Sequence, residues 1–491
     1  MNKALLATLV AVPVAAAYPA ASWYLGQQVE SALADQYKAL ENIPYLKVIE
    51  RKYERKLFDA TEVVTFEVMG EMARALEKSR KASAEADPSQ AKEGQTPIEP
   101  LRFTVSSQIQ HGPLAGFKTP AAAVQDSELV FSDQTKKEIA KIIGDKKPLT
   151  VHTVYRFDGG GVTELTSPAF SATPDGQTGK IAWEGFKATV NFAKRMQTYS
   201  YTAEAPRLDI DDGKGFKATV TDVKMDGNQK RIYDDEPMLY SGTQRFFIAK
   251  IDSADADTTK PQISIEKFVY DVNLPSNGDF LDILAKMAVD TLKVNGQNFG
   301  PAHYDFSAKH LHARTVASLY RNMMKLYSDP SFATGEGDTE AMAKAMMEPM
   351  KALLSFNPEL SIDRISFNTG NGEAVVSANA KLKDAKPEEI DNPMLLLGKL
   401  EANAEASVPE LFLAKAEDGA LLENGTKMTP EMEAQLLAGL DKELAGFASQ
   451  GYIERSNGVV KSKVAFRNGQ LTVNGKPFAL GGMPGAAGAG K

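Results

Sequence analysis

Histidines are the side chains of this sequence whose types and spacing could most directly do chemistry. His111 precedes a Gly-Pro pair, so its imidazole could face a ligand, but a hydrogen bond that caps the turn explains it equally well, and we favour that structural role. His310 and His312 would share one face of a strand, and two imidazoles at that spacing could bind one metal ion. Because no third ligand is evident, we predict no metal site and assign no catalytic residue.

Acidic residues and known catalytic motifs give no stronger signal. Asp209, Asp211 and Asp212 resemble the start of a calcium loop, but Val220 occupies the twelfth position, where a bidentate Glu is needed. The sequence contains no nucleophile elbow, Walker loop or dinucleotide fingerprint. We therefore expect no cofactor. The enzyme hypothesis that stays open is a hydrolase whose site is assembled from distant residues such as His111.

Methionines supply the remaining candidate for binding. Met346, Met347 and Met350 crowd a predicted helix, and flexible thioether side chains can line adaptable apolar grooves, although such residues more often fill a core. The candidate ligand-facing residues are thus His111, Met346, Met347 and Met350.

Composition excludes several classes of protein. The 491 residues include no Cys, which rules out disulfides, thiol nucleophiles and zinc-thiolate sites. The net charge is -8, and Lys and Arg are scattered among Asp and Glu, so we expect no nucleic-acid partner.

An uncharged, mostly apolar run at residues 4–25 predicts where the protein works. A helix needs about 20 residues to cross bilayer hydrocarbon, and Lys3 is the only charge before the run. The sequence predicts a single-pass anchor in the bacterial inner membrane, with the rest of the chain in the periplasm. Cleavage as a signal peptide at the small residues Ala15 to Ser22 is the alternative. Trp23 and Tyr24 favour the anchor, because such residues are common at the membrane interface.

The elements after this run are mainly strands. One face gathers Leu101, Phe103, Val105 and Ile109, and alternation returns in residues 374–382 and 460–466. One apolar and one polar face is typical of antiparallel sheets. Seven Asn-Gly pairs predict tight hairpin turns; they begin at Asn277, Asn295, Asn371, Asn424, Asn457, Asn468 and Asn474.

An internal repeat supports an extended sheet. GFKATV occurs at residues 185–190 and again at 215–220, a period that suits one strand-turn-strand unit. Helical spacing of apolar residues predicts helices near 281–294, 313–327, 339–355 and 430–449, and a continuation of the first helix over 22–42.

These patterns predict an α+β, predominantly antiparallel β fold: an extended curved sheet with several packing helices, preceded by an amino-terminal transmembrane helix. The expected segments are an anchor or signal segment at 1–25, a helix and first strands at 26–70, a helix end and flexible polar insertion at 71–100, a β-rich body at 101–480 and a disordered tail at 481–491.

Four segments together resemble the YdgA-like family of bacterial envelope proteins, a family without assigned biochemical function. They are residues 51–68, IQHGPLAG at 109–116, residues 298–313 and residues 467–480. The first segment keeps the family's Tyr53, Arg55 and Phe58 and has Lys56 where the family usually has glycine. The resemblance implies a periplasmic protein anchored in the inner membrane and supplies no catalytic residue.

We therefore expect a non-catalytic structural or binding role in the envelope, with apolar envelope molecules as candidate ligands. The periplasmic hydrolase is the alternative. The expected partners are the membrane, through the first helix, and a lipid or envelope protein; the sequence leaves the oligomeric state open, with a homodimer among the alternatives.

Overall fold

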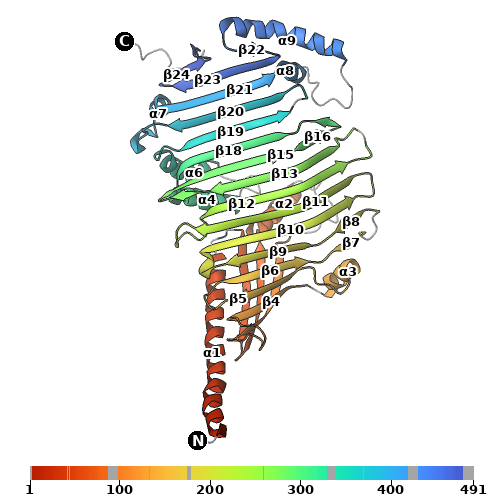
Figure 1. Ribbon diagram of the computed structural model, residues 1–491, viewed down its shortest axis with the longest axis vertical. Helices are drawn as coiled ribbons and strands as arrows, with labels where there is room; N and C mark the ends of the chain where they lie inside the picture. The colour runs from red at the N-terminus through yellow and green to blue at the C-terminus, as the bar shows by residue number, and fades with distance from the viewer. Residues whose placement is uncertain are drawn as a thin grey trace.

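The computed structural model folds the chain into one long, curved antiparallel sheet, with α1 (Lys3–Leu40) at one end, α9 (Pro430–Gln450) at the other and shorter helices along both side edges (Figure 1). It describes residues 3–40, 43, 45–86, 98–131, 133–173, 178–257, 259–328, 339–368, 370–417 and 429–478. In the predicted helix end and flexible insertion at 71–100, residues 71–86 form a helix and residues 87–97 lie outside the described residues; the predicted tail at 481–491 lies wholly outside them.

All named strands belong to the same sheet. Their bounds are β1 Leu46–Arg55, β2 Asp59–Val68, β3 Leu101–His111, β4 Ala123–Val130, β5 Thr150–Tyr155, β6 Gly161–Ser167, β7 Phe170–Ala172, β8 Lys180–Trp183, β9 Phe186–Phe192, β10 Thr198–Asp211, β11 Lys217–Arg231, β12 Tyr240–Ala254, β13 Ile263–Leu274, β14 Ser276–Asn277, β15 Phe280–Val289, β16 Thr291–Val294, β17 Gln297–Asn298, β18 Ala302–His312, β19 Glu359–Asn368, β20 Glu373–Leu382, β21 Leu400–Pro409, β22 Glu454–Ser456, β23 Val459–Arg467, β24 Gln470–Val473 and β25 Lys476–Pro477.

Helices lie between the strands. Their bounds are α1 Lys3–Leu40, α2 Gly70–Ala86, α3 Asp133–Ile143, α4 Ala313–Ser328, α6 Thr339–Leu354, α7 Pro393–Lys399, α8 Glu410–Glu417 and α9 Pro430–Gln450, with short 3-10 turns η2 Lys194–Met196 and η3 Pro387–Glu389. The helices predicted near 313–327, 339–355 and 430–449 are confirmed, as is the helical continuation over 22–42. Among the residues that the structure describes, no helix has both the length and the apolar character needed to cross a bilayer.

Strand order follows chain order almost throughout. Hydrogen-bonded neighbours run β1, β2, β3, β4, β5, β6, β9, β10, β11, β12, β13, β15, β18, β19, β20, β21, β23, β24 and β25, and every pairing is antiparallel. Consecutive strands can pair in this way because short turns join them. The α1 helix begins beyond one end of this sheet (Figure 1).

Asn-Gly turns join several of these strands, as predicted. Asn295, Asn457, Asn468 and Asn474 and the glycines that follow them all have positive φ, the conformation of a type I′ hairpin turn. Asn424 lies outside the described residues.

The GFKATV repeat marks one hairpin period of the sheet. The first copy enters β9 and the second enters β11, and both strands pair with β10, which lies between them. The prediction of strand-turn-strand units within an extended sheet is confirmed.

The helix predicted at 281–294 is wrong, because this segment forms β15 and β16. Its Leu and Ala residues fit a helical period and a strand period equally well. Two neighbouring strands decide the outcome: β15 pairs with β13 on one side and β18 on the other, which satisfies its backbone groups on both edges.

The hairpin between β24 and β25 offers a clean test of turn chemistry. Gly475 has a φ of 76°, and a Cβ atom added there would contact nothing within 4 Å, so any cost is backbone strain alone. We expect Gly475→Val to lower the free energy of unfolding by about 1 to 2 kcal/mol, and Gly475→Asn to cost much less, because Asn tolerates positive φ. Thermal unfolding of both variants measures this; equal costs would contradict the assignment.

Candidate functional site

One face of the sheet has a band of uncharged side chains that crosses most of the strands, whereas the same face carries the charged residues Arg207, Lys250 and Glu266 nearer one end of β10, β12 and β13. Paired residues of neighbouring strands place their side chains on the same face, so the register defines rows that cross the strands. We call the face on which α1 packs the inner face and the opposite one the outer face. Row 1 of the inner face runs from β5 to β21 and consists of Val151, Leu165, Ala188, Ala203, Met225, Phe246, Tyr270, Met287, Tyr304, Ile365, Val376 and Ala406.

A second row lies beside the first. Row 2 runs from β9 to β24 and consists of Val190, Tyr201, Gly227, Gln244, Val272, Ala285, Phe306, Ile362, Ala378, Ala404, Val464 and Val473. Neither row contains a charged side chain. Several members are open to solvent: the exposed fractions of Met225, Tyr270 and Tyr304 are 40%, 38% and 47%.

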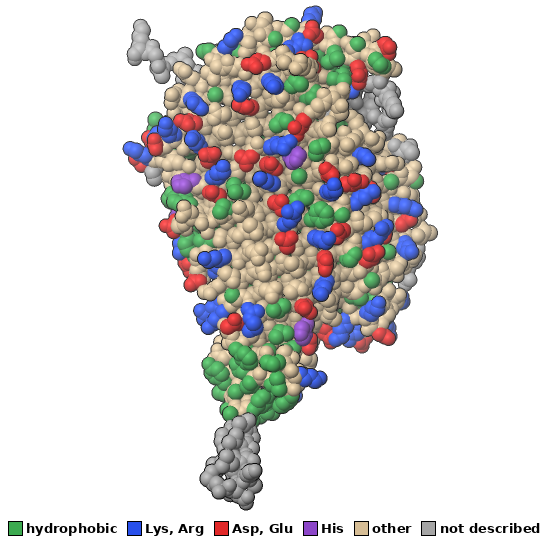
Figure 2. Space-filling view, in the orientation of Figure 1, with side chains coloured by type: hydrophobic (Ala, Val, Ile, Leu, Met, Phe, Trp, Pro, Cys, Tyr) green, Lys and Arg blue, Asp and Glu red, His purple; other side chains and the backbone are tan. Residues whose placement is uncertain are grey.

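The outer face carries charges instead. Arg245 of β12 lies 3.8 Å from Asp271 of β13, and Lys463 of β23 lies 3.0 Å from Glu405 of β21. Charged side chains of both signs are spread over the strands in Figure 2. Exposed apolar side chains that adjoin one another, such as Met225, Tyr270 and Tyr304 of row 1, are typical of a surface that binds a ligand or a partner.

The α1 helix occupies the beginning of the inner face. Val29 and Leu33, one turn apart, are buried against Ala60, Ile109 and Ala123 of β2, β3 and β4. Nearer the amino terminus of α1, the Tyr18 hydroxyl donates a hydrogen bond to the Leu114 carbonyl at 2.6 Å. The helix therefore packs mainly on the first strands, and it does not extend over most of the strands that carry the two rows.

A buried carboxylate lies under the carboxyl-terminal part of α1. Glu62 is fully buried and accepts hydrogen bonds from Arg51 Nε at 2.8 Å and from the Tyr37 hydroxyl of α1 at 3.1 Å. The Arg51 guanidinium also lies over the rings of Tyr37 and Tyr53. A buried charge is tolerated because it is paired and hydrogen-bonded, and losing either partner would leave the other unpaired. This cluster ties the helix to the sheet.

We call the contact between α1 and strands β1 to β5 the α1 seam. The tyrosines in it resist ionisation. Burial, and then the charges of Glu30 and Glu62, raise the pKa of Tyr53 to about 12. Burial, followed by the Glu62 charge, also raises the pKa values of Tyr37 and Tyr155 well above the usual range. These shifts reflect desolvation beside a carboxylate and need no catalytic role.

His111 belongs to the same seam. It ends β3, is 1% exposed, and its Nδ1 lies 2.9 Å from the Ser22 carbonyl of α1. Gly26 packs directly on the imidazole, since a Cβ atom there would lie 2.5 Å from the ring. Gly112 likewise faces the Ser22 side chain at a φ of 136°. The HGP motif thus forms the docking surface for α1.

A serine, a histidine and a glutamate lie together on β18, β19 and β20, but their hydrogen bonds do not connect them as in a catalytic triad. His303 Nδ1 lies 3.2 Å from Ser366 Oγ, and the Ser366 hydroxyl, together with Arg364, holds the pKa of Glu373 below its usual range. A catalytic triad needs the acid on the histidine, whereas here it contacts the serine. Ser366 is also only 1% exposed, so a substrate could not reach it.

His310 and His312 lie in an aromatic stack. The His310 ring stacks on Phe280 with centroids 4.0 Å apart, and the His312 ring stacks on Phe356 at 4.2 Å. Their Nδ1 atoms are occupied by the Phe356 carbonyl and the Thr315 hydroxyl. Within the described part of the chain, no three His, Asp or Glu side chains are grouped as a metal site would require.

The methionines of α6 lie away from the two rows. α6 packs against α4 beside one end of β13, β15 and β18 (Figure 1). Met347 and Met350 are exposed, and Met346 is half-buried. The structure therefore does not bring the four candidate residues together: His111 lies in the α1 seam, and the methionines lie at the sheet edge.

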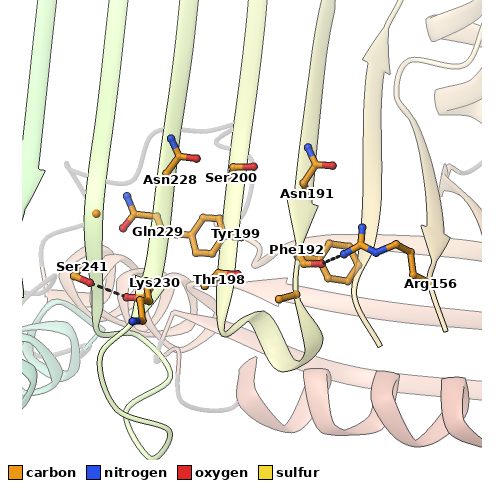
Figure 3. A pocket seen from close by; sticks show the side chains of 12 residues that line it. Arg156, Asn191, Phe192, Thr198, Tyr199, Ser200, Asn228, Gln229, Lys230 and Ser241 are labelled. Atoms are coloured by element: carbon orange, nitrogen blue, oxygen red, sulfur yellow. Dashed lines mark hydrogen bonds between the residues drawn. The ribbon is translucent and has the colours of Figure 1, made fainter. Parts of the chain in front are cut away.

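One hollow is lined by residues of both faces of the sheet. Its volume is about 540 Å³, and it lies where β9, β10, β11 and β12 meet the turns that join them (Figure 3). Asn191, Ser200 and Asn228 form one cross-strand row in it, on the face opposite Phe192 and Tyr199. Arg156 borders the hollow and donates a hydrogen bond to the Phe192 carbonyl at 3.0 Å. The lining combines no nucleophile with a general base, so it does not resemble a catalytic site.

The sequence analysis singled out Tyr53, Arg55 and His111 but did not predict that they contact α1, and it did not single out Arg51 or Glu62. Arg51, Tyr53 and Arg55 alternate along β1 and face α1, a pattern visible in the letters RKYER. The burial of Glu62 could not be predicted from the sequence, because an isolated Glu in a strand usually faces solvent.

Comparison with known proteins identifies relatives over the whole chain. The model of the family described as "Bacterial protein of unknown function (DUF945)" matches residues 1–481. Protein YdgA of Escherichia coli is 20% identical over 515 residues, which cover 98% of this chain and 95% of YdgA. An uncharacterised protein of Haemophilus influenzae is 21% identical over 361 residues, covering 70% of this chain and 89% of that protein. No solved structure matches.

The tight contact of Gly26 with His111 predicts that Gly26→Ala lowers the stability of the protein, although Gly→Ala in a helix usually raises it. In an open helix, Gly→Ala stabilises by up to about 1 kcal/mol, and Gly439 of α9, which has open space around it, provides that control. We expect Gly26→Ala instead to destabilise by about 1 to 3 kcal/mol, because its methyl group overlaps the imidazole. Thermal unfolding and protease cleavage between α1 and β1 report the effect. Equal stabilisation by both substitutions would show that the seam is loose.

The raised pKa of Tyr53 predicts sensitivity to alkali. A folded-state pKa of about 12 lies above the unfolded value of about 10, so this stability is fully present below pH ~10 and is lost as the pH rises toward 12. The Tyr53 hydroxyl has no hydrogen-bond partner, so Tyr53→Phe should leave stability at pH 7 unchanged within about 1 kcal/mol and weaken the alkaline loss. Denaturant unfolding across this pH range tests it, and an unaltered alkaline slope would refute it.

Proposed function

Because this chain belongs to the DUF945 family, whose function is unknown, we propose from its own geometry that it is a non-catalytic binding protein of the bacterial envelope. It is tethered to the inner membrane by residues 4–25, with the sheet in the periplasm, and it holds apolar envelope molecules on the inner face. The observation that carries the proposal is the pair of uncharged, solvent-open rows that cross the sheet beside α1.

The chemistry of the rows favours a lipid chain over a polar ligand. Their side chains are aliphatic, aromatic or thioether groups, with Gln244 and the tyrosine hydroxyls as the polar exceptions. An apolar chain gains roughly 25 cal/mol for each Å² that it buries, and it needs no hydrogen-bond partner from the protein. The group of Ser366, His303 and Glu373 does not support the hydrolase alternative, because Ser366 is buried and the acid contacts the serine instead of the histidine.

Crosslinking from the two faces of the same strands tests this proposal. A photoreactive benzoylphenylalanine would replace Met225, Tyr270 or Tyr304 on the inner face, each in the full chain and in cells. The matched controls replace the sequence neighbours Lys224, Asp271 and Asp305, which point to the outer face. Mass spectrometry should find lipid adducts at least fivefold more abundant from the inner-face positions. Equal or absent adducts on both faces would overturn the binding role.

Cell fractionation of the same cultures tests the tether. The full-length chain should sediment with the inner membrane and remain there after a high-salt wash, because hydrophobic insertion is insensitive to salt. Recovery of a chain lacking residues 1–22 in the soluble periplasmic fraction would refute the anchor.

A further inference from the structure

The apolar rows are too long for a site that holds one lipid chain. Neighbouring strands are about 4.8 Å apart, so row 1, from β5 to β21, extends roughly 50 Å. A single acyl chain spans half of a hydrocarbon core about 30 Å thick, or about 15 Å. A single-ligand pocket would end after such a distance, whereas these rows continue across the sheet.

Nothing within the rows fixes a ligand at one place. A binding site holds its ligand with a few convergent polar groups, and neither row has a charged member. The register shift between β18 and β19 could have turned the faces over, yet Tyr304 pairs with Ile365 and Phe306 with Ile362, so both rows pass through it. Both rows therefore continue across the register shift between β18 and β19.

The lining also argues against a peptide as the occupant. The strands that carry the rows pair on both sides, as β11 does with β10 and β12, so their backbones cannot accept an added strand. A peptide lying on the rows would therefore gain no hydrogen bonds from the sheet for its own amide groups. An acyl chain has no such groups.

The two ends of the rows differ. Row 1 begins at β5, whose Tyr155 packs against the α1 cluster, and row 2 begins at β9. On the proposed function, the amino-terminal part of α1 lies in the inner membrane. At the other end, row 2 reaches Val473 of β24, near the carboxyl-terminal end of the sheet (Figure 1). The same face thus leads from the anchored end to the opposite end.

We propose that the inner face is a conduit along which acyl chains of membrane lipids move, entering beside α1 and passing from strand to strand toward β24. This proposal rests on the proposed function, and it adds that binding positions along the face are visited in sequence. The lipid head group would remain in solvent along the open side.

Charged substitutions in the middle of the inner face, which we call the roadblock, distinguish a conduit from a set of independent binding sites. Val376→Arg with Ala378→Arg places two charges across rows 1 and 2 on β20. The matched control, Ser377→Arg with Asn379→Arg, places the same charges on the outer face of the same strand. Benzoylphenylalanine in place of Tyr201 of β10 reports on the inner face before the roadblock. Benzoylphenylalanine in place of Phe466 of β23 reports on the inner face beyond it.

The full-length protein in cells should give lipid adducts at both reporters. With the roadblock, the adduct at Tyr201 should persist and the adduct at Phe466 should fall at least fivefold, while the outer-face control keeps both. Unchanged labelling at Phe466 behind the roadblock would overturn the conduit and leave the binding role standing. Absence of adducts at both reporters in the parent protein would overturn the binding role itself.

Protein folding is checked in the same samples by protease digestion. If the double substitution unfolds the chain, both adducts are lost together, and the single substitution Ala404→Arg on β21 replaces it, with Asn403→Arg as its outer-face control. The same two adduct ratios then decide the outcome.

Discussion

The structure depends on one constraint: in a continuous antiparallel sheet, the register decides which face every side chain occupies. A slip of one residue in a single pairing would move that strand's apolar set to the charged face. The pairings keep the sets aligned from β5 to β24, including at the register shift between β18 and β19. Two uncharged rows and a charged opposite face follow from this alignment. The continuous uncharged band is therefore a property of the register as a whole and of no single motif.

The α1 seam makes the sheet asymmetric. Glu62, Arg51 and Tyr37 form a buried charged cluster, and His111 receives the helix on the other side. Such a cluster contributes little net stability relative to apolar packing, but it is costly to break, so it fixes where the helix lies. With α1 fixed on the first strands, row 1 begins at a defined place beside it. The proposed entry of lipid chains at this end follows from the position of the helix.

The histidines show why candidate chemistry must be weighed against structure. His111, His310 and His312 all have their Nδ1 atoms engaged by backbone or hydroxyl groups of neighbouring elements. Each helps to hold two segments together, α1 with β3, or β18 with the residues around it. The three imidazoles serve here in packing and hydrogen bonding. The functional surface is made instead from residues that have no reactive group.

The sequence alone determined the β-rich class, the alternation within strands, the Asn-Gly hairpins and most helices, because these depend on local spacing and on φ preferences. It misassigned residues 281–294, whose apolar residues fit both periods until β13 and β18 pair with them. Only the tertiary structure decided that the apolar faces of distant strands join into two rows, and that His111 lies under α1 while Met346, Met347 and Met350 lie at the sheet edge. Register and helix docking are relations between segments far apart in the chain, and local spacing carries no information about them.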